Sequence, residues 1–193
     1  MTPPLPDSVA AQNIVATLRA LSESRALTWP EERSIAERQA ALLLALSGID
    51  EPPVPLFVIT ALPGIQIDWR AGWPLSGMAV QTRPHHWRIV IASHEPLRRK
   101  RFSVAHEFKH VLDDPFIDRV HPHLKAEQHE RRSERLCNYF AACLLMPRGW
   151  LKADWAAGIQ NLRELAKRYY VSDVAMRTRL QELGLLTEQE ASR

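Results

Sequence analysis

The segment His106-Glu107-Phe108-Lys109-His110 constrains this chain more than any other, because it has the pattern H-E-x-x-H. Two histidines four positions apart lie one above the other on one face of a helix, close enough to bind a single zinc ion. The glutamate between them points off that face, where it can contact a water molecule on the metal and act as a general base. The pattern therefore predicts a helix that carries a hydrolytic zinc site.

The apolar residues around this motif indicate a helix with one buried side. At about 100° per residue, they fall on the side opposite the histidines. These residues are Leu97, Val104, Phe108 and Val111. We expect the helix to pack this side on a core and to present the histidines to a cleft. The alternative is a surface helix whose two histidines bind no metal.

A hydrolytic zinc ion needs a third protein ligand and one open position. The extended form H-E-x-x-H-x-x-G-x-x-H is excluded, because positions 113 and 116 hold Asp113 and Phe116. The other solution is a glutamate from a later helix, and Glu134 is the candidate that shares a helix face with Asn138. Its main rival is Glu130, one turn earlier. Further candidates in or beside the intervening loop are His121, His123 and His129.

The remaining pattern predicts an α+β fold. Helices are expected over residues 13–24, 30–47, 56–61, 96–112, 129–146, 160–169 and 172–183. Strands are expected over residues 65–69, 78–81 and 87–92, the last two joined as a hairpin through 82–86. We expect these strands to form a small sheet, mostly antiparallel or mixed.

The domain organisation follows from these elements and from the proline-rich breaks between them. We expect a flexible tail over residues 1–12 and an N-terminal helical segment over 13–52. Residues 53–150 would form the core that carries the site, and 151–193 a C-terminal helical subdomain. In the latter, residues 165–185 resemble a helix-turn-helix with Arg177 and Arg179 pointing outward.

Composition and charge exclude several classes of protein. A net charge of +3 gives no basic coat, so it does not favour nucleic-acid binding. The N-terminus lacks the features of a signal peptide, and no apolar run is long enough to span a membrane. Cys137 and Cys143 fall on one predicted helix about 9 Å apart along its axis, too far for a disulfide. We therefore expect a cytoplasmic protein with no membrane contact.

Two stretches of the chain resemble the ImmA/IrrE-type metallopeptidase family. Residues 98–110, RRKRFSVAHEFKH, are similar to its basic R-x-x-F-T/S-x-A-H-E-x-x-H helix. Residues 134–147, ERLCNYFAACLLMP, are similar to its E-x-x-A-N-x-F-A-A-x-L-L-M-P signature. The two motifs occur in the right order, and the resemblance covers about residues 54–186. It implies a zincin-like peptidase with a second, ligand-bearing helix.

The resemblance also implies roles for individual residues. His106, His110 and Glu134 would bind Zn²⁺, and Glu107 would be the catalytic base. The substrate would be a protein, such as a transcriptional repressor or an antitoxin-like regulator. Asp113 and Asp114 are candidates for orienting a histidine through a hydrogen bond, or else are residues of the loop after the helix.

Two positions depart from the family pattern. Lys109 stands where the family commonly has a small residue, and we expect its side chain to reach the cleft. Cys137 replaces an alanine and is interpreted as a small buried residue.

Two other functions compete with peptide hydrolysis. The first is a DNA-binding or adaptor module with a structural zinc site, and the second is a partner-binding protein with an inactive site. The basic run at residues 98–101 is interpreted as a solvated helix start, or as a site that attracts an acidic partner.

Overall fold

A computed structural model describes residues 8–23, 25–116 and 124–186 of the chain. Its strands are β1 (Ile65–Arg70), β2 (Gly77–Arg83) and β3 (His86–Ala92). Its helices are α1 (Ser8–Arg19), α2 (Trp29–Leu46), α3 (Phe57–Thr60), α4 (Leu97–Asp113), α6 (Ala126–Leu145), α7 (Arg148–Ala156), α8 (Leu162–Arg168) and α9 (Asp173–Glu182), with a 3₁₀ turn η1 (Asp114–Phe116) after α4. The predicted α+β class is therefore confirmed.

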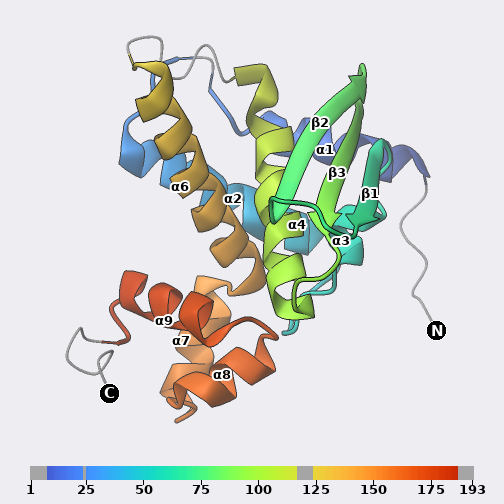
Figure 1. Cartoon of the computed structure of the whole chain (residues 1–193). Helices are drawn as coiled ribbons and strands as arrows, with labels where there is room; N and C mark the ends of the chain where they lie inside the picture. The colour runs from blue at the N-terminus through green and yellow to red at the C-terminus, as the bar shows by residue number, and fades with distance from the viewer. Residues whose placement is uncertain (1–7, 24, 117–123, 187–193) are drawn as a thin grey trace.

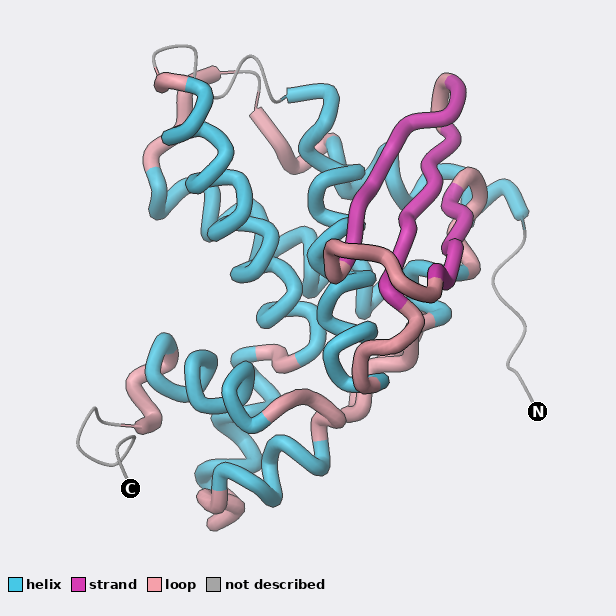
Figure 2. The backbone as a smooth tube through the Cα atoms, in the orientation of Figure 1, coloured by secondary structure: helices cyan, strands magenta, loops and turns pink. Residues whose placement is uncertain are grey.

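The three strands form one mixed sheet in the order β1-β3-β2. The central strand β3 pairs in parallel with β1 and antiparallel with β2, so only one of the two strand pairs is antiparallel. The hairpin between β2 and β3 is confirmed. Figure 2 shows the strands gathered in one layer on one side of the molecule. This order leaves β2 at the edge of the sheet, beside α4.

Helix α4 lies between the sheet and α6, as Figure 1 shows. Val104, Phe108 and Val111 are fully buried on its inner side, as predicted. Leu97 is 48% exposed, contrary to prediction, because it occupies the first turn before the helix reaches the core. The rings of Phe108 and Phe140 lie 6.3 Å apart between centroids, which joins α4 to α6 in the core.

A buried polar network joins α4 to α2 behind this core. Lys109 is only 1% exposed, and its ammonium donates to Gln39 Oε1 at 2.9 Å and to Asp113 Oδ1 at 2.5 Å. The Gln39 amide in turn donates to the Leu18 carbonyl at 3.0 Å. The prediction that Lys109 reaches the cleft is therefore wrong. A buried ammonium needs acceptors, and those acceptors lie on the side of α4 that faces α2.

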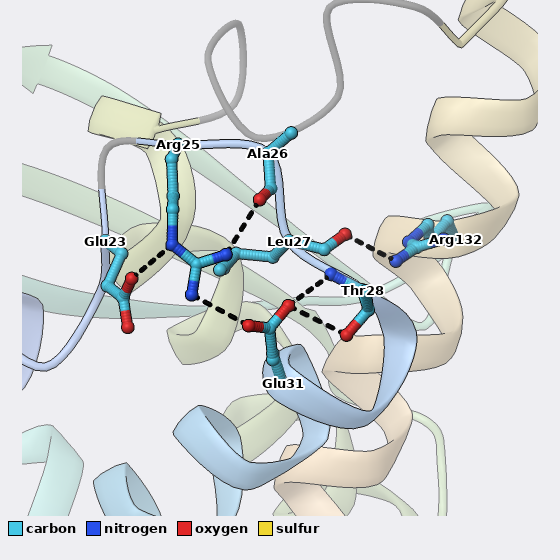
Figure 3. A network of polar contacts seen from close by, with 7 residues as sticks. All are labelled: Glu23, Arg25, Ala26, Leu27, Thr28, Glu31 and Arg132. Carbon is cyan, nitrogen blue, oxygen red and sulfur yellow. Dashed lines mark hydrogen bonds and ion pairs between the residues drawn. The ribbon is translucent and has the colours of Figure 1, made fainter.

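The start of α2 is fixed to the loop before it and to α6, as Figure 3 shows. Glu31 accepts hydrogen bonds from the Thr28 backbone and hydroxyl, both at 2.7 Å, and pairs with Arg25 at 2.7 Å. Arg132 of α6 donates to the Leu27 carbonyl at 3.1 Å. These contacts hold the first turn of α2 in place beside α6.

Helices α7, α8 and α9 gather at the C-terminal end of α6 (Figure 1). Arg179 of α9 is 1% exposed, and its guanidinium donates to the Met146 carbonyl at 3.2 Å and lies 5.5 Å from the Tyr139 ring centroid. The prediction that Arg179 points outward is therefore wrong. It satisfies a carbonyl just beyond the last turn of α6 instead.

Several boundaries differ from those predicted. Helix α1 begins at Ser8, within the predicted tail of residues 1–12, of which residues 1–7 lie outside the described part. Helix α7 was not predicted, because Pro147 indicated only the end of the preceding helix, whereas Pro147 is also the N-cap of α7. The domain limits at residues 52 and 150 stay predictions.

Two further findings concern membranes and thiols. Within the described residues, no helix combines the length and apolar content that a bilayer-spanning segment requires. Cys137 and Cys143 are buried free thiols, as the helix spacing predicted.

The network around Lys109 gives a stability prediction. Lys109→Met should lower the free energy of unfolding by about 2 kcal/mol, because it leaves the Gln39 oxygen and Asp113 without their donor. Urea unfolding followed by circular dichroism measures this change. Lys152→Met, at an exposed position on α7, is the control and should change stability by less than about 0.5 kcal/mol. Equal stabilities of the two variants would contradict the structural role of Lys109.

Candidate metal centre

The side chains of His106, His110 and Glu134, from α4 and α6, converge at one point. The Nε2 atoms of His106 and His110 lie 3.3 Å apart. The Glu134 carboxylate places Oε1 3.1 Å from Nε2 of His110 and Oε2 3.3 Å from Nε2 of His106. Two histidines of α4 thus meet the carboxylate of Glu134, which lies 24 positions after His110 in the chain.

These distances fit a zinc ion. In a tetrahedral site with zinc–ligand bonds of about 2.0–2.1 Å, neighbouring donor atoms lie ~3.3 Å apart. The distance between the two imidazole nitrogens, and the distance from each nitrogen to one Glu134 oxygen, all lie within about 0.2 Å of that value. The donor set, two imidazoles and one carboxylate, is also typical of hydrolytic zinc.

Asn138 orients one of the two imidazoles. It lies one turn after Glu134 on α6, and its Oδ1 is 3.0 Å from Nδ1 of His106. This contact directs Nε2 of His106 toward the convergence point. Burial, followed by the neighbouring His110, lowers the pKa of His106, which favours the neutral ring that binds metals.

The orienting role of Asn138 was not predicted. The sequence placed Asn138 on the face of Glu134, and that shared face was the signal that could have revealed the contact. Asp113, a candidate for this role, binds Lys109 instead. Asp114 lines the cleft and, within the described residues, has no hydrogen bond to a histidine.

The other candidate ligands are placed differently from Glu134. Glu130 lines the same cleft as Glu134 but, within the described part of the chain, forms no ion pair with either imidazole. His129 lines a separate small pocket beside Lys109 and Arg132. His121 and His123 lie outside the described residues.

Cys137 is a buried neighbour of the two imidazoles. Its Sγ and the ring nitrogens of His106 and His110 all lie within 4.8 Å of one another, so the thiol is an alternative metal ligand. Burial raises the pKa of this thiol well above its ordinary value, which disfavours the thiolate that metals bind. The sequence suggested only a small buried residue here, although Cys137 follows Glu134 by one helical turn.

The edge strand β2 holds the carboxylate of Glu107. This side chain is buried, and it accepts a hydrogen bond from the backbone N–H of Ala79. Burial, with a smaller contribution from Glu134, raises the pKa of Glu107 to about 7. A Cβ atom at Gly77 would lie 2.6 Å from Glu107 Oε1, so only glycine allows β2 to approach this closely.

The convergence point opens into a cleft of about 690 Å³. Residues of the loop before β2 and of β2 itself form one wall, and α4 and α6 form the others. The side chains of His106 and His110 are 13% and 27% exposed, so both rings remain accessible from this cleft.

Comparison with known proteins identifies the family. Residues 73–181, more than half of the chain, match the model of a peptidase family described as the IrrE N-terminal-like domain. The chain belongs to the ImmA/IrrE family of metallopeptidases. The matched range contains the cleft, both histidines and Glu134.

Two curated relatives agree with this membership. The chain is 33% identical over 140 residues to the radiation response metalloprotease IrrE of Deinococcus radiodurans. The aligned region covers 69% of this chain and 40% of that protein. It is 37% identical over 95 residues to the protein of the same name from Deinococcus deserti, covering 46% of this chain and 34% of that protein. The chain therefore spans well under half the length of either relative.

A solved structure, a Mycobacterium tuberculosis transcriptional regulator, has a similar fold. The TM-score is 0.60 over 87% of this chain and 51% of that one. At 18% sequence identity, this similarity concerns the fold alone.

The site geometry predicts which residues retain zinc in this family member. Glu134→Ala should weaken zinc affinity by at least ~100-fold, because changes to residues that only orient a ligand already cost 10–100-fold. Glu130→Ala and Cys137→Ala should leave the zinc affinity within ~3-fold of wild type. The Cys137 thiol is neutral, and the Glu130 carboxylate is not paired with either imidazole. Competition with a chromophoric chelator measures all three. Loss of zinc from Cys137→Ala and not from Glu134→Ala would contradict this ligand set.

A second prediction concerns the contact between β2 and Glu107. Gly77→Ala should reduce peptidase activity by ~10²-fold or more, because the new methyl group displaces the Glu107 carboxylate from its position. Zinc content and the thermal unfolding midpoint should stay near wild type. Gly149→Ala, where a Cβ meets no atom within 4 Å, is the matched control. Full activity in Gly77→Ala would show that the close approach of β2 has no catalytic consequence.

Proposed function

We propose that this chain is a zinc-dependent endopeptidase in which His106, His110 and Glu134 bind the metal and Glu107 is the general base. The observation that carries the proposal is the convergence of three ligand atoms beside a buried carboxylate in an open cleft. Membership of a metallopeptidase family supports it.

Zinc bound there would supply a Lewis acid and would lower the pKa of a water molecule toward ~7. Glu107 accepts the proton of the attacking water and then transfers it to the leaving amine. Burial raises the pKa of Glu107 above its ordinary value, which makes its carboxylate a stronger base toward the proton of the attacking water. The Ala79 N–H holds one carboxylate position while this transfer occurs.

The shape of the cleft supports internal cleavage of a protein chain. The cleft extends past the histidines toward Asp114 and Glu130 in one direction and toward Arg99 and Phe102 in the other. An extended peptide can therefore continue on both sides of the scissile bond. As the family resemblance suggests, we propose that the substrate is a regulatory protein such as a transcriptional repressor or an antitoxin-like protein.

The alternative, a DNA-binding or adaptor module with a structural or inactive zinc site, has less support. The sequence suggested DNA binding because a helix-turn-helix would carry Arg179 on its outer face. In the structure this side chain is buried against Tyr139 and Met146. The two free thiols fit a reducing compartment, so we also propose a cytoplasmic location.

Glu107→Gln tests the proposed reaction. The zinc-loaded variant should lose activity by ~10²–10⁴-fold, because general-base catalysis contributes about that much. The assay uses a quenched fluorescent peptide library together with the purified regulator encoded nearest to the gene, and zinc content is measured in parallel. Cleavage by the variant at the wild-type rate with zinc retained would exclude Glu107 as the base. Absence of cleavage by the wild type would count against a peptidase.

A further inference from the structure

A second hollow, of about 810 Å³, continues from the cleft between the start of α2, α6 and α9. It shares Arg99, Phe102 and Asn138 with the cleft, so the two are contiguous. We call it the basic groove, because arginines and aromatic rings dominate its lining. These residues are Trp29, Arg33, Arg98, Arg99, Arg135 and Tyr139.

Two of these arginines are held by aromatic rings and not by carboxylates. The guanidinium of Arg33 lies 4.3 Å from the Tyr139 ring centroid, and that of Arg135 lies 4.7 Å from the Trp29 centroid. Within the described part of the chain, neither forms an ion pair. Arg33 also hydrogen-bonds the Tyr139 side chain. Because a guanidinium carries five N–H donors, both arginines keep donors that can bind an anion.

The acidic side chains near the groove do not neutralise its arginines. Arg98 lies 4.0 Å from Asp173 and Arg99 lies 3.8 Å from Glu95, both at the limit of an ion pair. Among the described lining residues, Glu182 is the one acidic side chain, and it pairs with Arg179 at 3.2 Å. The groove therefore carries a net positive charge.

The cleft has the opposite sign at its other end. Asp114 and Glu130 line it beyond His110, away from the groove. The charge thus changes from negative to positive along α6, with the convergence point between the two ends. A bound peptide would experience this gradient along its length.

The distance along α6 indicates which substrate positions are affected. Ala142, which lines the groove, follows Glu134 by about 12 Å along the helix axis. An extended peptide advances about 3.3 Å per residue, so this span corresponds to roughly three to four residues. The arginines therefore face side chains within about four positions of the scissile bond.

We infer that the basic groove binds an acidic segment of the protein substrate, within about four residues of the bond that is cut. This inference rests on the proposed peptidase function, because it takes the occupant to be a polypeptide. Its carboxylates would pair with Arg33 and Arg135, while its apolar side chains would contact Val174, which is 74% exposed at the rim.

The surroundings of the groove favour a peptide over a nucleic acid. The groove meets the cleft at Asn138, the residue that orients His106. Helix α9 contributes only uncharged side chains and Glu182 to the lining, and its Arg179 is buried. The start of α2, which carries Trp29 and Arg33, is held by the contacts in Figure 3, so the groove is preorganised.

The test measures binding without cleavage, using the zinc-loaded full-length Glu107→Gln protein. The probes are fluorescein-labelled decapeptides with four glutamates in either the N-terminal or the C-terminal half, and their glutamine counterparts. Fluorescence anisotropy should show one glutamate peptide binding at least ~10-fold more tightly than its glutamine counterpart, with the preference weakened by salt.

Variants then assign the preference to the groove. Arg33→Gln combined with Arg135→Gln should abolish it, and Arg33→Lys combined with Arg135→Lys should retain part of it, because the charge remains. The matched control is Arg38→Gln combined with Arg131→Gln, which removes the same charge from the same two helices outside the groove. Thermal unfolding confirms that each variant is folded.

Several outcomes would overturn the inference. They are equal binding of glutamate and glutamine peptides, equal loss in the control variant, or a 20-base-pair DNA duplex that displaces the peptide through Arg33 and Arg135 at physiological salt. Failure of the proposed peptidase function is distinguishable, because it would appear as no cleavage by wild type while the glutamate preference in Glu107→Gln persists.

Discussion

The packing of α4 against α6 sets the distances on which the site depends. Phe108 and Phe140 meet in the core between these helices, and the small, fully buried Ala141 lets them approach. His106 and His110 lie on α4 and Glu134 lies on α6. The close approach of the two helices therefore leaves neighbouring donor atoms of these residues 3.1–3.3 Å apart. A shift of one helix by even ~1 Å would separate the proposed ligands, because catalytic geometry tolerates little displacement.

Other elements support this pair of helices from three sides. The sheet packs on α4, and its edge strand β2 reaches Glu107 through Ala79 and Gly77. Helix α2 packs on α6 and joins α4 through Gln39 and Lys109. At the far end, Arg179 ties α9 to the carbonyl of Met146. The first two contacts restrain backbone segments close to proposed catalytic or metal-binding side chains, and the third fixes the C-terminal end of α6.

The features that could be predicted from the sequence are those that depend on the spacing of nearby residues. The helix over α4, the outward histidines and the hairpin between β2 and β3 all follow from periodicity within a few residues. Family resemblance, and not spacing, distinguished Glu134 from Glu130, because both lie on nearly the same face of α6. The parallel pairing of β1 with β3 could not be predicted, since it depends on a crossover and not on the pattern of either strand.

The misinterpreted residues share one physical cause. Lys109 and Arg179 are charged side chains that the sequence analysis placed in the cleft and on the outer face of a helix. Each is buried in the structure because a partner from a distant segment satisfies it. Gly77 is similar, since its importance depends on where the Glu107 carboxylate lies. No pattern within one helix or strand reveals such partners.

The most direct test of the central claim is zinc X-ray absorption on the zinc-loaded, full-length protein. Two imidazole nitrogens are expected at about 2.0–2.1 Å and carboxylate or water oxygens at about 2.0–2.2 Å, with no sulfur neighbour. A sulfur scatterer at about 2.3 Å, which Cys137 beside the histidines would supply, would contradict this ligand set. A spectrum without imidazole scattering would equally contradict it.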